Sequence, residues 1–67
     1  MVTKPKLEEA WRMAIRKEQE SRELYLRLKA MSEDSAARNL FDFLAKEEER
    51  HERMLQDEFD RAFTPDM

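Results

Sequence analysis

Apolar side chains recur along most of the chain at alternating steps of three and four residues, which is the spacing of one face of an α-helix. In the first half of the chain the positions at these steps are Leu7, Trp11, Ala14, Glu18, Ser21, Tyr25 and Leu28. In the second half they are Ala37, Phe41, Leu44, Glu48, His51 and Leu55. Ala10, Ile15 and Leu24 widen the first stripe. The pattern predicts two long helices, each with one apolar stripe.

Helix-capping residues predict where the first helix begins and where the chain turns. Pro5 suits the first turn of a helix because the N–H that it lacks would have no partner there. We therefore expect the first helix over about residues 5–31 and a turn at about residues 32–35. Serine and aspartate compete with helical hydrogen bonds and favour helix starts, so Ser32 or Asp34 is expected to cap the second helix.

The second helix is expected over about residues 35–63. Its apolar pattern loosens after Leu55, and Thr64 precedes Pro65, which disfavours helical geometry at Thr64. Two helices of this length, each about 35–40 Å long and joined by a short turn, make an antiparallel hairpin. The whole chain, residues 1–67, is therefore expected to be a single all-α domain.

The composition agrees with long helices and limits how such a hairpin can be stabilised. Charged residues make up 43% of the 67 positions, and the chain has no glycine, as is typical of long helices. Cysteine is absent, which excludes disulfides, thiolate metal sites and thiol catalysis. A single hairpin buries one seam and leaves its other apolar surface in water, so we predict that two identical chains pair into a four-helix bundle.

Charge and hydropathy argue against nucleic-acid and membrane partners. The net charge is -3, from 13 basic and 16 acidic side chains that are mixed along the chain, so there is no basic patch for nucleic acid. No apolar run reaches the roughly 20 residues needed to span a bilayer, and the segment before Pro5 lacks the apolar core of a signal peptide. We expect a soluble, cytoplasmic protein.

Apart from Ser21, three polar residues interrupt the apolar stripes, and all three can bind a metal. Glu18 interrupts the first stripe, and Glu48 and His51 interrupt the second. Glu48 and His51 are three residues apart, so both side chains lie on one face of a helix. Glu18 and Glu48 are equally far from residue 33, in the middle of the predicted turn, and are therefore expected at the same level of the hairpin. The spacing predicts a cluster of two carboxylates and one imidazole in the seam.

Two carboxylates side by side in a poorly solvated seam repel each other unless a cation lies between them. Glu18, Glu48 and His51 of two paired chains would together supply four carboxylates and two imidazoles, which is the ligand set of di-iron and di-manganese sites in helical bundles. This donor set suits iron or manganese, and zinc and copper also bind it. The alternative is a metal-free polar layer that makes the pairing of the helices specific.

Other polar and aromatic positions are interpreted as structural. A solvated acidic face is expected from five carboxylates that lie off the two stripes: Glu20, Glu23, Glu47, Glu49 and Glu52. An alternative for these carboxylates is a path that attracts cations toward the cluster. Trp11 and Tyr25 are expected to pack in the core, with a role for Tyr25 near a metal as the alternative.

Two runs of residues carry a resemblance to a known family. The run from Glu18 to Tyr25 resembles the first-helix motif of the ferritin-like superfamily in its rubrerythrin branch, and the run from Phe41 to Leu55 resembles the second-helix motif. The resemblance covers about residues 7–60. Because the chain holds a single hairpin with one Glu and one Glu-x-x-His, it is similar to the encapsulated ferritins.

The resemblance implies a ferritin-like four-helix bundle made by two chains, with ferroxidase activity for iron storage or detoxification. It implies that Glu18, Glu48 and His51 of both chains bind two Fe(II) ions, with the Glu48 pair bridging them, and that oxygen oxidises the iron. These three residues are thus the expected metal ligands and catalytic residues. The resemblance also implies a ring of such dimers and an encapsulin shell as partner and compartment. The cysteine pairs that hold the rubredoxin centre of full rubrerythrins are absent.

Overall fold

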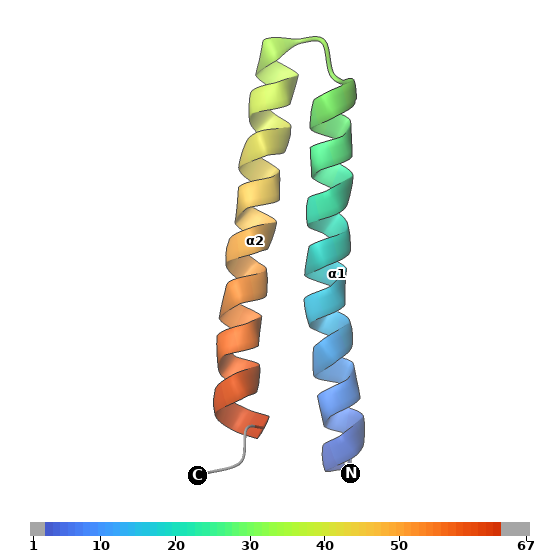
Figure 1. Cartoon of the computed structure of the whole chain (residues 1–67), viewed down its shortest axis with the longest axis vertical. Coiled ribbons are helices and arrows are strands. Elements are labelled where there is room, and N and C mark those ends of the chain that lie inside the picture. The colour runs from blue at the N-terminus through green and yellow to red at the C-terminus, as the bar shows by residue number, and fades with distance from the viewer. Residues whose placement is uncertain (1–2, 64–67) are drawn as a thin grey trace.

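The computed structural model describes residues 3–63, which form two long helices joined by a short turn (Figure 1). Helix α1 is Lys4–Met31 and helix α2 is Ser35–Phe63, and the two lie antiparallel, side by side. The all-α, two-helix hairpin predicted from the apolar pattern is confirmed. The end of the second helix predicted at Thr64 and Pro65 lies outside the described residues.

Two residues of the turn, Ser32 and Asp34, each cap the end of one helix. After the last residue of α1, the Ser32 N–H donates to the Lys29 carbonyl at 3.3 Å, and the Ser32 hydroxyl donates to the Leu28 carbonyl at 2.6 Å. The Asp34 carboxylate accepts a hydrogen bond from the Ala37 N–H at 2.9 Å, in the first turn of α2. Of the two residues expected to cap the second helix, Asp34 does so, while Ser32 satisfies carbonyl groups at the end of α1.

The two helices bury few side chains between them. Within residues 3–63 only Ile15, Ala45 and Phe59 are buried. The predicted stripe on the first helix placed Ala14 at its centre and Ile15 at its edge, but Ile15 is buried and Ala14 is exposed. The apolar stripe of α1 is wider than the surface that α2 covers. Some of its residues therefore lie outside the contact between the helices, on one side of the hairpin.

Aromatic side chains hold the helices together at the end opposite the turn. The Trp11 indole N–H donates to the Leu55 carbonyl at 3.0 Å, and the ring centroids of Trp11 and Phe63 are 5.9 Å apart in an edge-to-face contact. The ring centroids of Phe59 and Phe63 are 4.9 Å apart, and the Arg12 guanidinium of α1 lies 4.7 Å from the centroid of the Phe59 ring. Trp11 therefore packs between the helices, at the end of the hairpin farthest from the turn.

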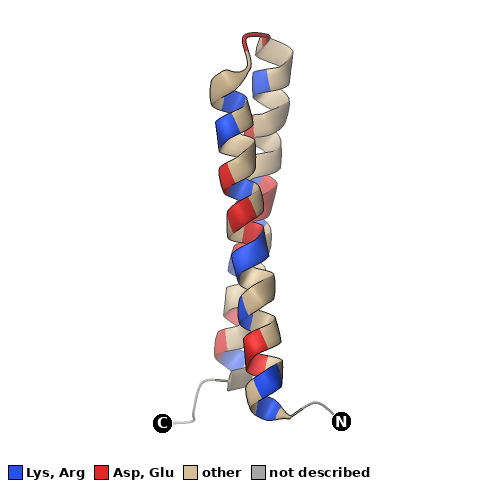
Figure 2. Ribbon diagram, turned by 90° about the vertical axis from the view of Figure 1, so that its right-hand side faces the viewer, with Lys and Arg blue, Asp and Glu red and all other residues tan. Residues whose placement is uncertain are grey.

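The hairpin leaves much apolar surface exposed. Eight large apolar side chains of the described residues are exposed: Leu7, Met13, Leu24, Leu26, Met31, Leu40, Phe43 and Met54. Basic and acidic residues alternate along the side of the hairpin seen in Figure 2, so this side carries no block of one charge. Neither α1 nor α2 carries an apolar stretch that could cross a bilayer. Exposed apolar surface on this scale is typical of a chain that associates with another surface.

Candidate metal centre

Glu18 from α1 and Glu48 and His51 from α2 come together midway along the hairpin. One ligand atom of each residue lies within 4.8 Å of the others. The His51 Nδ1 atom is 3.5 Å from Glu18 Oε2 and 3.7 Å from Glu48 Oε1. The three-residue step on α2 puts Glu48 and His51 on one face, and the turn brings Glu18 to their level. The structure thus groups the three titratable residues that interrupt the apolar stripes.

The cluster is partly buried, and one of its oxygen atoms finds no hydrogen-bond partner among the described residues. Side-chain exposure is 26% for Glu18, 18% for Glu48 and 41% for His51. Glu18 Oε2 is itself buried and has no hydrogen-bond partner in the part of the chain that the structure describes. A buried carboxylate oxygen without a partner is costly, and a bound cation removes that cost. Two carboxylates and an imidazole this close together therefore fit a metal ion such as iron.

The Glu18 carboxyl group raises the pKa of Glu48 above its ordinary value. The largest cause is that Glu18 lies close enough to share a proton with Glu48. Burial and the negative charges of Glu18 and Glu47 act in the same direction, and a positive charge on His51 acts in the opposite one. The folded cluster therefore favours a bound proton, or a metal ion in place of that proton.

Glu48→Gln is expected to stabilise the metal-free protein more at pH 8 than at pH 5. Because folding raises the pKa of Glu48, the folded chain binds more protons than the unfolded chain, and this carboxyl group lowers the free energy of unfolding as the pH rises. Glutamine carries no charge and removes that contribution. Thermal unfolding in EDTA at both pH values measures the difference between the variant and the wild type.

Glu49→Gln is the matched control for this prediction. Glu49 neighbours Glu48 on α2, but its side chain is exposed and pairs with Arg53 at 3.5 Å. The control is expected to show no extra stabilisation at the higher pH. Equal effects of the two variants at both pH values would contradict a repulsion between Glu18 and Glu48.

Glu47 lies at the other edge of the His51 ring. Its Oε2 atom is 3.9 Å from His51 Nε2 and accepts a hydrogen bond from the Arg50 guanidinium at 2.8 Å. The hydrogen bond from Arg50 holds the pKa of Glu47 below its ordinary value, although partial burial opposes the shift. Glu47 therefore places a negative charge beside Nε2, while Nδ1 faces the two other carboxylates.

The cluster opens onto an apolar groove on one side of the hairpin. The groove has a volume of about 380 Å³ and is lined by Trp11, Glu18, His51, Met54, Leu55 and Glu58. Trp11, Met54 and Leu55 make its wall largely apolar. Burial of such a wall is favourable, so the groove beside the cluster favours contact with a second apolar surface.

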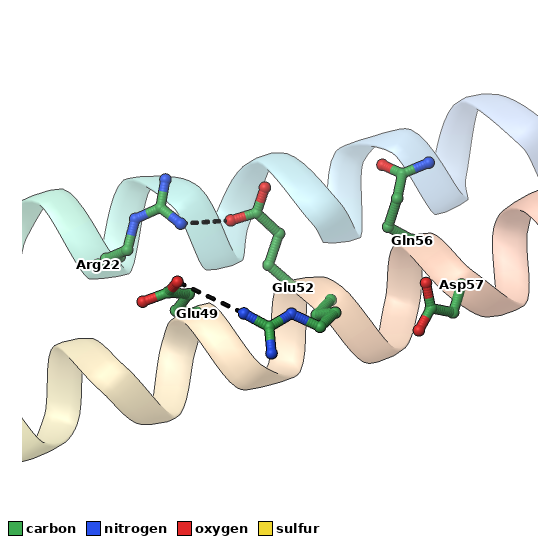
Figure 3. Close-up of a pocket in the computed structure, with 6 residues that line it drawn as sticks. Arg22, Glu49, Glu52, Gln56 and Asp57 are labelled. Atoms are coloured by element: carbon green, nitrogen blue, oxygen red, sulfur yellow. Dashed lines mark hydrogen bonds and ion pairs between the residues drawn. The ribbon is translucent and has the colours of Figure 1, made fainter.

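The prediction that Glu52 belongs to a solvated acidic face is wrong. Its side chain is 20% exposed and forms an ion pair with Arg22 at 2.6 Å, across the seam (Figure 3). Glu52 also accepts a hydrogen bond from Gln19 Nε2 at 2.7 Å. The spacing does not predict this contact, because Arg22 lies one turn nearer the hairpin turn than Glu18, whereas Glu52 lies one turn farther from it than Glu48. The long side chains of Arg22 and Glu52 bridge that offset.

A known family matches this chain over most of its length. A family model described as rubrerythrin matches residues 1–59. The matched segment takes in α1, the turn and most of α2, and it contains Glu18, Glu48 and His51. No curated protein and no solved structure matches the chain.

Proposed function

The chain belongs to the rubrerythrin family, and on that premise we propose that it is a di-iron carboxylate protein that oxidises Fe(II) with oxygen, for iron storage or detoxification. Membership of this family suggests a di-iron carboxylate protein and is compatible with iron-redox activity. The observation that carries the proposal is the buried Oε2 atom of Glu18, which lies beside Glu48 and His51 and has no hydrogen-bond partner among residues 3–63. A bound metal ion gives this atom the partner that the described residues do not supply.

The complete site needs two chains. One chain supplies two carboxylates and one imidazole, which is half of the ligand set that holds two iron ions in a helical bundle. The groove beside the cluster is largely apolar, and the exposed side chain of Met54 lies in its wall. A second copy of the hairpin, packed on this side about a two-fold axis, covers the groove and brings its own Glu18, Glu48 and His51 to the same centre.

Fe(II) is the substrate of the proposed reaction, and oxygen accepts its electrons. The carboxylates of Glu18 and Glu48 are hard oxygen ligands, and their negative charge favours the more highly charged, oxidised ion. His51 binds through an unprotonated ring nitrogen, and the carboxylate of Glu47 beside Nε2 favours Nδ1 as that nitrogen. A ring of dimers and an encapsulin shell enter the proposal through the resemblance to encapsulated ferritins alone.

Anaerobic loading with Fe(II) is expected to raise the temperature of thermal unfolding, and EDTA is expected to lower it again. A ligand present at 100 times its dissociation constant adds about 2.7 kcal/mol to the free energy of unfolding. The metal also offsets the repulsion that raises the pKa of Glu48. Thermal melts of one preparation, with Fe(II) and with EDTA, measure the difference.

A metal-free dimerisation module makes the opposite prediction. If Glu18, Glu48 and His51 form only a polar layer for specificity, the melting temperature is the same with and without EDTA, and joint replacement of the three residues by leucine raises it. A third outcome is stabilisation by manganese or zinc in place of iron. Elemental analysis of protein purified without added metal identifies which ion the chain holds.

A further inference from the structure

A second pocket, of about 280 Å³, lies on another face of the hairpin (Figure 3). It is lined by Arg22, Glu49, Glu52, Arg53, Gln56 and Asp57. Both arginines are paired within the pocket, Arg22 with Glu52 at 2.6 Å and Arg53 with Glu49 at 3.5 Å. Arginines that are already neutralised have little charge left to attract a ligand. The pairing instead points to a role within the protein, because one of these ion pairs joins the two helices.

Glu52 of α2 contacts α1 at the level of the metal cluster through Gln19, and it also contacts Arg22, one turn nearer the hairpin turn. Glu52 directly follows His51 in the chain, and Gln19, its second donor, directly follows Glu18. Neighbouring residues of a helix differ by about 1.5 Å along the axis and about 100° around it. The contact between Glu52 and Gln19 therefore lies at the height of the cluster but on another face, so the helices are joined at this level from two sides of the seam.

Apolar packing does little to position the helices at the cluster itself. Ile15 lies one turn before Glu18, and Ala45 lies one turn before Glu48, so these buried side chains flank the cluster on either side along the hairpin. Phe59 is farther away, near the end of α2. The side chains that meet across the seam at the level of the cluster are polar and partly buried.

We propose that Glu52 is a positioning residue for the metal centre. By accepting hydrogen bonds from Gln19 and Arg22, Glu52 sets the position of α1 against α2. A slide of one residue moves a helix by about 1.5 Å, whereas hydrogen-bond lengths vary by only about 0.5 Å, so the two bonds oppose such a slide. The position of the helices in turn sets the separation of Glu18 from His51. The inference rests on the proposed function, because it concerns the site that holds the metal.

Glu52→Ala is expected to weaken Co(II) binding about tenfold while the protein stays helical. Co(II) is the probe because it takes the same carboxylate and imidazole ligands as Fe(II) and is not oxidised by air under these conditions. Titration followed by visible absorbance gives the affinity, and circular dichroism gives the helix content. Exchange of the two charges, Arg22→Glu with Glu52→Arg, restores an ion pair across the seam and is expected to recover most of the affinity.

Asp42→Ala is the matched control. The ion pair of Asp42 with Lys29, at 2.8 Å, also joins the two described helices, but nearer the turn. Its loss is expected to lower the melting temperature and to leave Co(II) affinity unchanged. A second measurement needs no metal, because the chain has a single histidine whose imidazole NMR signals report on the cluster. Arg22→Ala is expected to shift these signals, and Asp42→Ala is not.

Unchanged Co(II) affinity in Glu52→Ala, or a loss no larger than that of Asp42→Ala, would overturn the inference. If Glu52→Ala does not fold, Glu52→Gln is tested instead, because glutamine keeps an oxygen acceptor for Arg22 but loses the charge. Glu52→Gln must then lose more Co(II) affinity than Asp42→Asn. Wild-type protein that binds no Co(II) counts against the proposed function instead. The imidazole signals then still decide whether Arg22 and Glu52 position the cluster.

Discussion

Glu48→Ala and His51→Ala are each expected to abolish saturable Fe(II) binding, which the wild type should complete at about one iron per chain. Each substitution removes one of the three ligand side chains of a chain, and two-fold pairing doubles the loss at the shared centre. The rate of iron oxidation is expected to fall to that of free Fe(II) in the same buffer. Anaerobic titration followed by admission of air, read by absorbance, measures both quantities.

Glu49→Ala is the control for these two variants, because Glu49 is adjacent to Glu48 but has an exposed side chain paired with Arg53. It is expected to bind and oxidise iron as the wild type does. Unchanged uptake in Glu48→Ala or His51→Ala would show that the ligands lie elsewhere. A wild type without saturable uptake would exclude ferroxidase activity at this cluster, and saturable uptake of manganese or zinc alone would change the metal and keep the ligands.

Met54→Glu is expected to separate the paired chains and to abolish iron uptake, although all three ligand residues stay in place. Met54 is 56% exposed in the single chain and lines the apolar groove beside His51. A second chain that covers the groove buries this position, where a carboxylate would lie unpaired. The cost is about 3 kcal/mol for each chain, and two-fold pairing counts it twice, which weakens association about 10⁴-fold. Analytical ultracentrifugation of the variant and the wild type gives the oligomeric state.

Leu26→Glu is the control for the loss of pairing. Leu26 is 45% exposed, so it resembles Met54 in exposure. It lies two turns after Gln19, on the face of α1 that contacts Glu52, and this face lies away from the groove. This variant is expected to pair and to take up iron normally. A wild type that takes up iron as a monomer would refute a centre shared between two chains. A Met54→Glu variant that stays paired would refute the groove as the interface.

Under the proposed function, the cluster links iron binding to the stability of the protein. Without a metal, Glu18 raises the pKa of Glu48, so the two carboxylates oppose folding when both are charged. With a metal, the same two carboxylates become ligands, and binding adds to the free energy of unfolding. Glu48→Gln is therefore expected to lose iron binding and to stabilise the metal-free protein. Opposite signs of these two effects would distinguish a ligand from a purely structural residue.

The amino-acid sequence by itself determined the hairpin and the level of the cluster. Alternating steps of three and four residues define one helix face, because an α-helix has about 3.6 residues per turn. The capping chemistry of Ser32 or Asp34 places the start of the second helix, and the structure then selects Asp34. From that turn, antiparallel geometry brings Glu18 opposite Glu48, and a three-residue step adds His51. These features are local, or follow from counting residues on either side of a turn.

Only the tertiary structure decided how each helix is rotated toward the other. It buries Ile15 in place of Ala14 and brings Glu52 into contact with Arg22. Within the described part of the chain it also leaves one buried oxygen of Glu18 without a hydrogen-bond partner. The apolar stripe of each helix is broad enough to allow several rotations. The one adopted depends on how the side chains of both helices interlock along the seam, and the periodicity of either helix alone does not contain that information.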